Sequence, residues 1–166
     1  AQGQLDVLKG ATSELMSNDA IELSVFIMEH VNLDTTTTAM QLFAEADLLR
    51  FQNRDDEAIA KMDSLAAAFK GHNLEDDILF AKAQIAVSRR QYSKAAEFYQ
   101  TIITQYKDGI LADNALFALA ELYETRLNDP KKAMELYDTI IVDFSSSLYV
   151  VESRKRFRKL RGDDIP

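Results

Sequence analysis

The chain repeats one pattern with a period of about 37 residues. Two columns of residues recur at this spacing, a phenylalanine column of Phe43, Phe80 and Phe117 and an alanine column of Ala46, Ala83 and Ala120. A third column is formed by Ala58, Ala95 and Ala133. Its second interval is one residue longer, and the additional residue falls in the segment TRLNDP, where an insertion lengthens only a loop and costs little. Because a unit of this length cannot bury its apolar face alone, the repeat predicts a linear array.

Each copy is predicted to form two helices joined by a short turn. In the third copy, the i, i+3, i+4, i+7 spacing of a buried helix face is followed by Leu116, Leu119, Ala120 and Tyr123. The turn that follows contains Asp129, a suitable N-cap, and Pro130, which is tolerated in the first helical turn because its missing N–H is not needed there. Short connections of this kind make successive helices antiparallel neighbours.

The composition excludes several classes of protein. With only 5 Gly and 2 Pro in 166 residues, the chain has too few turn-forming residues for an all-β sandwich or barrel. The net charge of −8 argues against a nucleic-acid partner, and no apolar run is long enough to span a membrane. The absence of cysteine excludes disulfides and thiolate metal sites. These observations predict an all-α protein without a membrane span.

The residues shared by the copies resemble the tetratricopeptide repeat, whose pattern is W-x2-L-G-x2-Y, then A-x3-F, then P. The pattern positions are occupied by Leu116, Leu119, Ala120, Tyr123, Ala133 and Tyr137 in the third copy, by Leu79, Lys82, Ala83, Ala86, Ala95 and Tyr99 in the second, and by Leu42, Glu45, Ala46, Leu49, Ala58 and Met62 in the first. The departures are the longer period, the absence of Trp, and Ser145, Lys107 and Lys70 at the closing Pro position.

The resemblance covers about residues 35–161 and implies a right-handed superhelical solenoid of antiparallel helix pairs, with a C-terminal capping helix. The long period is similar to that of repeats in bacterial envelope proteins. The segment SLYVVESRKRFRKLRGD looks like the closing part of large tetratricopeptide proteins from Bacteroidetes-type bacteria. This likeness implies that the chain is the C-terminal part of a longer protein, and it favours the bacterial periplasm or cell envelope over the cytoplasm.

We expect residues 1–166 to form one repeat domain. Its expected parts are a degenerate first unit at 4–33, repeats at 35–72, 73–109 and 110–147, and a capping helix at 148–161. Because the open end of a solenoid exposes apolar surface, the capping helix should cover the last repeat with its apolar residues and turn its basic residues to water. The residues expected to face the last repeat are Leu148, Val151, Phe157 and Leu160.

No pattern in the sequence indicates catalysis, a cofactor or a metal site. His30 and His72 are the only histidines and lie in different units, and no HExxH, GxSxG, P-loop or GxGxxG motif occurs. The acidic clusters at 55–57, 75–77 and 163–164 lack the spacing of a calcium-binding loop and are typical of charges near helix N-termini. We therefore predict that the chain is not an enzyme and binds no cofactor.

The segment 154–161 holds six Lys or Arg residues. Three interpretations are open: a solvated face of the capping helix, a contact with an acidic partner or lipid headgroups, and a nucleic-acid contact. The last needs stacking aromatic residues beside the basic ones, and only Phe157 is present. The solvated face is the favoured interpretation.

The family resemblance implies that the first helix of each pair lines a concave binding groove. Carried over by register, the groove positions form five columns: Met40, Asp77 and Asn114; Phe43, Phe80 and Phe117; Asp47, Gln84 and Glu121; Arg50, Val87 and Glu124; Phe51, Ser88 and Thr125. A phenylalanine column beside acidic residues would suit an apolar segment flanked by Lys or Arg, since aromatic anchors dominate binding energy and charges steer association. Alternatively, the three phenylalanines pack between helices.

These observations predict a non-catalytic scaffold that binds a protein or peptide segment in the groove. The alternative is a structural spacer or self-assembly module of a larger envelope-associated protein, in which the ends or the convex side make the contacts. The sequence determines neither the partner nor the oligomeric state.

Overall fold

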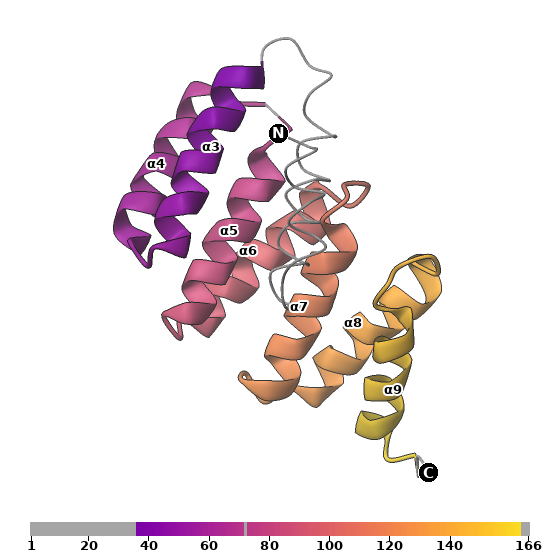
Figure 1. The fold of residues 1–166 in the computed structure, drawn as a ribbon. Coiled ribbons are helices and arrows are strands. Elements are labelled where there is room, and N and C mark those ends of the chain that lie inside the picture. Colours follow the sequence, from indigo (N-terminus) through magenta and orange to yellow (C-terminus); the bar gives the residue numbers. More distant parts are fainter. Residues whose placement is uncertain (1–35, 72, 164–166) are drawn as a thin grey trace, which may run out of the picture. The chain divides into compact units, whose positions relative to one another are not determined.

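The computed structural model describes residues 36–71 and 73–163, and these residues form seven α-helices and no strand (Figure 1). The helices are α3 (Thr36–Phe51), α4 (Asp55–Ala68), α5 (Glu75–Ser88), α6 (Tyr92–Gln105), α7 (Ala112–Thr125), α8 (Pro130–Asp143) and α9 (Val150–Arg161). The all-α fold predicted from the sequence is thus confirmed. The predicted degenerate unit at 4–33 and both histidines lie outside the described residues.

The chain divides into two compact units, residues 1–45 and residues 46–166. Of the first unit, the described part is the beginning of α3, where Ala39 is fully buried and Phe43 is 9% exposed. The second unit contains the end of α3 and all the helices from α4 to α9. None of the described helices is long and apolar enough to cross a membrane.

Within the second unit, every helix from α4 to α8 packs against the helix that follows it. Figure 1 shows α5 with α6 and α7 with α8 as two successive hairpins, with α9 following α8. One buried cluster joins α5, α6 and α7, and a second joins α7, α8 and α9. Helix α7 thus contributes to both clusters, which is the nearest-neighbour packing of a solenoid.

The six alanines of the repeat are all fully buried. They are Ala46, Ala58, Ala83, Ala95, Ala120 and Ala133. Since a methyl side chain lets two helix backbones approach closely, these positions explain why the alanine columns recur at the repeat period. The larger side chains of the pattern, such as Met62, Tyr99 and Tyr137, fill the space beside them and are at most 3% exposed.

The turn inside each helix pair has the same backbone geometry in all three copies. The N–H of the residue before the second helix donates to the carbonyl oxygen of the fifth or sixth residue upstream, in the pairs Arg54 to Leu49 (2.9 Å), Gln91 to Ala86 (2.8 Å) and Asp129 to Tyr123 (2.9 Å). The residue before each donor has a left-handed backbone, at Asn53, Arg90 and Asn128. The additional residue of the third copy is absorbed within this turn, as predicted from TRLNDP.

The turn before α9 repeats the turn before α7. The N–H of Gly109 donates to the Tyr106 carbonyl at 2.9 Å, and the N–H of Ser147, 38 residues later, donates to the Phe144 carbonyl at 2.8 Å. At the same offset, Ser153 of α9 corresponds to Ala115 of α7, and both are fully buried. The capping helix therefore begins as the first helix of a further pair.

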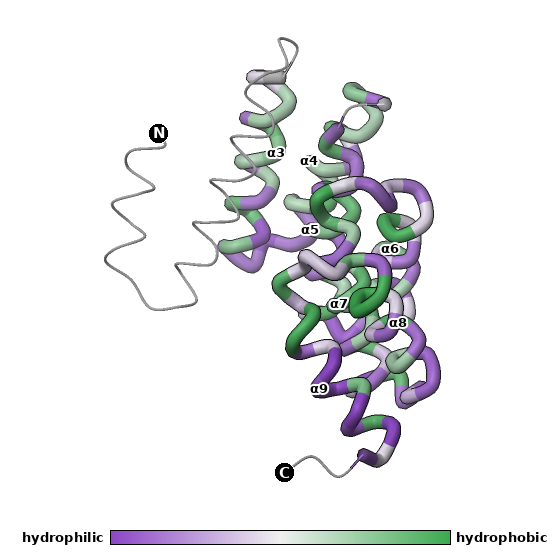
Figure 2. Tube along the Cα trace, turned by 90° about the vertical axis from the view of Figure 1, so that its right-hand side faces the viewer, coloured by the Kyte–Doolittle hydropathy of each residue, from purple (hydrophilic) through white to green (hydrophobic). Residues whose placement is uncertain are grey.

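The prediction of which residues of the capping helix face the last repeat is partly wrong. Leu148 is 95% exposed and Val151 is 78% exposed. The helix begins at Val150, and its 3.6-residue period directs Val150, Phe157 and Leu160 toward the α7–α8 cluster. Leu148 precedes the helix, and Val151 lies about 100° around the helix from Val150. Figure 2 shows α9 as predominantly hydrophilic along its length.

Candidate functional site

We use the term inner face for the predicted groove positions that lie in the second unit. They are Asp47 and Arg50 of α3, Asp77, Phe80 and Gln84 of α5, and Asn114, Phe117, Glu121 and Glu124 of α7. Within each helix, successive positions are three or four residues apart and share one side. All nine side chains are half-buried. The predicted positions Phe51, Val87, Ser88 and Thr125 also lie in the second unit, but they are exposed and are not counted in this face. Met40 and Phe43 belong to the first unit and are described apart from it.

The phenylalanines of the inner face contact tyrosines of the chain itself. The Phe80 ring meets the Tyr99 ring of α6 edge to face, with 5.5 Å between centroids. The Phe117 ring stacks on the ring of Tyr149, just before α9, at 4.5 Å and an interplanar angle of 17°, and it lies 5.9 Å from Tyr137. Both phenylalanines therefore pack between helices with part of each ring still accessible.

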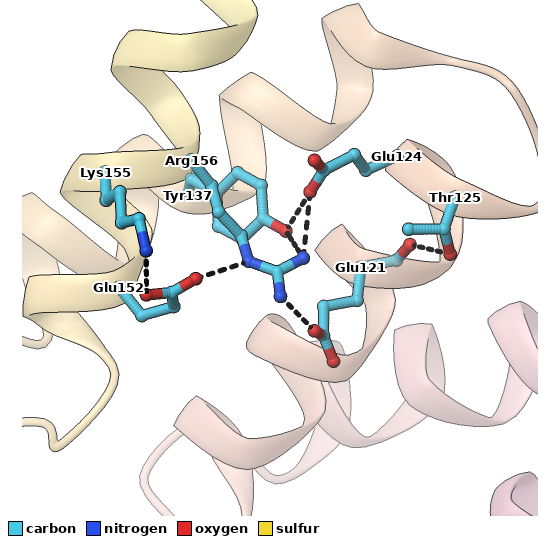
Figure 3. A network of polar contacts seen from close by, with 7 residues as sticks. All are labelled: Glu121, Glu124, Thr125, Tyr137, Glu152, Lys155 and Arg156. Atoms are coloured by element: carbon cyan, nitrogen blue, oxygen red, sulfur yellow. Dashed lines mark hydrogen bonds and ion pairs between the residues drawn. The ribbon is translucent and has the colours of Figure 1, made fainter. Parts of the chain in front are cut away.

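Arg156 of α9 reaches the acidic end of the inner face (Figure 3). Its Nη2 lies 2.7 Å from Glu121 Oε1, and its Nη1 donates to Glu124 Oε2 at 3.1 Å. Its Nε donates to Glu152 of α9 at 3.0 Å. The guanidinium also lies over the Phe117 ring, 5.6 Å from the centroid. The prediction that the basic residues of the capping helix face water is therefore wrong for Arg156.

Tyr137 of α8 lies beneath this arginine. Its hydroxyl donates to Glu124 Oε2 at 2.7 Å, so Glu124 accepts from both the phenol and the guanidinium (Figure 3). Burial raises the pKa of the Tyr137 phenol, and the hydrogen bond to Glu124 raises it further. Burial alone would lower the pKa of Arg156, but its hydrogen bonds to Glu152 and Glu124 outweigh this and raise the pKa. Both groups therefore keep their protons throughout the physiological range.

The negative charge of Glu121 also affects the pKa of Tyr99 in α6, the second helix of the preceding pair. Burial raises the pKa of the Tyr99 phenol to about 12, with a further contribution from the negative charge of Glu121 and an opposing one from the positive charge of Arg50. Arg50 is itself paired with Asp47, at 2.7 Å between Nε and Oδ1. Charges of alternating sign thus follow one another from α3 through α7 to α9.

The polar positions Asp77 and Asn114 lie in the first turns of α5 and α7. The Asn114 amide nitrogen donates to the Tyr149 hydroxyl at 3.0 Å, which links the first turn of α7 to the turn before α9. Asp77 lies in the acidic first turn of α5 together with Glu75 and Asp76. These acidic residues complement the partial positive charge at the helix N-terminus, as predicted.

The arrangement is suited to recognition by charge and aromatic contact. Within residues 36–71 and 73–163, no group of three His, Asp or Glu side chains is placed to hold a metal ion. What the inner face does hold is an arginine, bound between two carboxylates and over an aromatic ring. These contacts combine charge-assisted hydrogen bonds with a cation–π interaction.

Sequence reasoning did not identify Arg156, Tyr137 and Tyr149 as neighbours of the predicted groove residues. One signal was available. Aligning the capping helix with α7 at an offset of 38 residues places Arg156 at the position of Ala118, one residue from Phe117. The basic residues were interpreted as one solvated block, whereas one of them faces α7.

Comparison with protein families identifies the repeat type. Residues 114–147 match a family model described as the tetratricopeptide repeat. The matched segment begins in α7, contains all of α8, and ends in the turn before α9, so it corresponds to one helix pair. No curated protein matches the chain significantly.

Proposed function

We propose that this chain, whose residues 114–147 form a tetratricopeptide repeat, binds a protein or peptide segment along the inner face. Tetratricopeptide repeats are in general non-catalytic scaffolds for protein–protein interaction, and the pairwise helix packing of this chain is of that type. The finer part of the proposal, the face and its ligand, rests on the side chains described above. The alternating charges and half-buried rings suit a segment with apolar and basic residues.

The observation that carries the proposal is the position of Arg156. A basic residue of a partner was predicted to lie beside an aromatic ring and next to carboxylates. Arg156 of the chain itself makes these contacts with Phe117 and Glu121. The corresponding place one pair earlier has the ring of Phe80 and the polar side chain of Gln84. A partner arginine or lysine would lie there, over Phe80, with its apolar neighbours along α5 and α7.

A binding experiment tests this proposal with a defined probe. The probe is a fluorescein-labelled peptide, acetyl-Leu-Arg-Phe-Leu-Arg-Leu-amide, titrated with the whole chain while anisotropy is recorded. We expect saturable binding that weakens as salt is raised, because the attraction to the acidic inner face is screened. The substitution Gln84→Lys places a positive charge on the inner face and should weaken binding at least about fivefold through like-charge repulsion.

The matched control is Gln100→Lys, which adds the same charge at an exposed position on α6. It should leave binding of the peptide within about twofold of the unsubstituted chain, and circular dichroism should show equal helix content in all three proteins. An absence of saturable binding, or equal weakening by the two substitutions, would reject the inner face as the site.

A second function, self-assembly through the C-terminal end, is favoured by one observation. Leu148 and Val151 are the two most exposed of the large apolar side chains among the described residues; Val151 lies in the first turn of α9 and Leu148 just before it. Size-exclusion chromatography with light scattering distinguishes the two functions. A monomer at all concentrations excludes self-assembly, whereas a dimer that Val151→Ser converts to monomer would support it in place of the peptide-binding function.

A further inference from the structure

A small pocket lies between α4, α5 and α6, on the side of α5 opposite the inner face. Its volume is about 110 Å³. Its apolar wall is formed by Ile59, Ile85, Ala86 and Phe98. On α5, Ala86 lies about 200° around the helix from Gln84, at 100° per residue, so the pocket and the inner face use different sides of this helix. The pocket therefore lies outside the face assigned to the proposed function.

At the pocket, the second helix pair (α5 and α6) has an alanine where the third pair (α7 and α8) has a tyrosine. Ala86 and Tyr123 occupy the same place in their pairs, since the carbonyl oxygen of each accepts the N–H of the residue before the second helix, Gln91 or Asp129. The distances are 2.8 and 2.9 Å. A phenol side chain in one pair thus corresponds to a methyl group in the other.

In the third pair the tyrosine fills the equivalent space. The Tyr123 ring packs against the cluster that contains Leu122 and Leu136, and these residues correspond to Ile85 and Phe98 of the pocket. The Lys132 ammonium lies over this ring, 5.0 Å from its centroid. The third pair therefore shows which side chain such a space accommodates and which cation lies over it.

The second pair retains the lysine of this arrangement. Lys94, the counterpart of Lys132, lines the pocket, and its ammonium is 6.0 Å from the Phe98 centroid. Lys82 and Asp63, which also line the pocket, form an ion pair. An enclosed apolar cavity of about 150 Å³ holds a benzene ring. The present pocket is smaller, at about 110 Å³, and the exposed Lys94 is among the residues that line it, so a ring bound there would leave an edge outside the pocket.

We propose that this pocket binds a tyrosine side chain of a partner protein, with the ring against Ala86 and the Lys94 ammonium over it. The Tyr123 side chain of the third pair is the internal precedent for this ligand. The charges at the rim specify its surroundings. Lys82 is already paired with Asp63, whereas the exposed Lys94 contacts only an aromatic ring among the interactions described, so a carboxylate next to the partner tyrosine would pair with Lys94. The ligand is thus a tyrosine flanked by Asp or Glu.

The first test uses p-cresol, the analogue of a tyrosine side chain. The whole chain, labelled with 13C at methyl groups, is titrated with p-cresol, and methyl chemical shifts are recorded by NMR. We expect saturable shifts concentrated at the methyl groups of Ile59, Ile85 and Ala86. The substitution Ala86→Tyr, which copies the third pair, should fill the pocket and weaken the binding seen at Ile59 and Ile85 at least tenfold.

The matched control is Ala60→Tyr, which adds the same ring at an exposed position of α4 beside Ile59 and should leave p-cresol binding unchanged. Shifts that are scattered over the surface, or that persist in the Ala86→Tyr variant, would overturn the proposal. A loss of helix content in that variant would also overturn it, because the space would then not accommodate the ring.

The second test addresses the flanking charge. The peptide acetyl-Asp-Glu-Tyr-Asp-Glu-amide should shift the same methyl groups at lower concentration than p-cresol, and Lys94→Gln should remove at least threefold of this gain while leaving p-cresol binding within twofold. An equal response to acetyl-Lys-Lys-Tyr-Lys-Lys-amide would overturn the acidic-partner assignment. A response to the peptide with Ala in place of Tyr would overturn the assignment of the tyrosine.

Discussion

Arg156 was expected to face water with the other basic residues of the capping helix, but its side chain binds carboxylates of α7. Within the block 154–161 it has the same charge as its neighbours, yet its side chain is 24% exposed while that of Lys155 is 70% exposed. Three carboxylates and one phenol surround its guanidinium. The removal of a largely enclosed charge leaves its partners without a counter-ion, which costs more than the loss of an exposed pair.

We therefore expect Arg156→Met to lower the free energy of unfolding by about 1–3 kcal/mol. The matched variant Lys155→Met removes an exposed ion pair with Glu152, whose charged atoms are 3.8 Å apart, and should change stability by less than about 0.5 kcal/mol. Urea unfolding followed by circular dichroism measures both effects. Equal losses in the two variants would show that Arg156 acts only as one charge among several.

Tyr99 predicts a pH dependence of stability on the alkaline side. Its pKa is raised by burial to about 12 in the folded chain, whereas an unperturbed tyrosine titrates near pH 10. Between these values the unfolded chain loses the phenol proton while the folded chain retains it. The folded state therefore binds more protons, and its stability falls as pH rises from about 10 to 12.

The substitution Tyr99→Phe removes this contribution and retains the ring that contacts Phe80. Over the same pH interval, the unsubstituted chain should lose more stability than the variant, by up to about 2 kcal/mol. Urea unfolding at pH 9 and pH 12 provides the comparison. Parallel losses in both proteins would indicate that the Tyr99 phenol ionises equally in the folded and unfolded chains.

At the scale of the element, α9 shows how the array ends. We aligned α9 with α7 at an offset of 38 residues. The positions of α7 that pack on the preceding pair are then apolar or small in α9 too. Ser153, Phe157 and Leu160 correspond to Ala115, Leu119 and Leu122. The positions of α7 that pack on α8 are Leu116 and Ala120, and their counterparts in α9 are Arg154 and Arg158. Charged residues at these positions disfavour the packing of a second helix, because burying them would remove their hydration.

This assignment predicts effects of different size for two apolar residues of α9. Phe157→Ala should destabilise the chain by about 2–4 kcal/mol, because Phe157 packs on the α7–α8 cluster. Val151→Ala should have an effect within about 0.5 kcal/mol, since Val151 is 78% exposed. Thermal unfolding monitored by circular dichroism distinguishes the outcomes. A larger loss for Val151→Ala than for Phe157→Ala would reverse the assigned orientation of α9.

The boundaries of the helices were largely predictable at this scale. The expected restart at Asp129 and Pro130 is confirmed, since Asp129 caps α8 by accepting the N–H of Lys132 at 3.1 Å and Pro130 is its first residue. Such signals are local, because a cap and its helix lie within four residues of each other. The capping segment was expected from residue 148, whereas α9 begins at Val150. Val151 was expected on the same face as Phe157, although six residues place the two about 120° apart around a helix.

At the scale of the whole molecule, the sequence by itself determined the array of helix pairs. The period of about 37 residues, the buried alanines and the short turns are properties of successive residues, and each constrains only its own pair and the next. A repeating apolar pattern with no long loops therefore specifies the order of packing along the chain, from α4 to α9, without information about distant contacts.

The tertiary structure alone decided which side chains meet across helices. The Arg156 guanidinium binds Glu124, 32 residues earlier in the chain, and Phe117 stacks on Tyr149, also 32 residues away. The space beside Ala86 depends on how α4, α5 and α6 lie together. These features arise from the rotation of each helix about its own axis, and a difference of one residue in register turns a side chain by about 100°. Periodicity determines that a helix buries one face, whereas packing determines what that face and its margins contact.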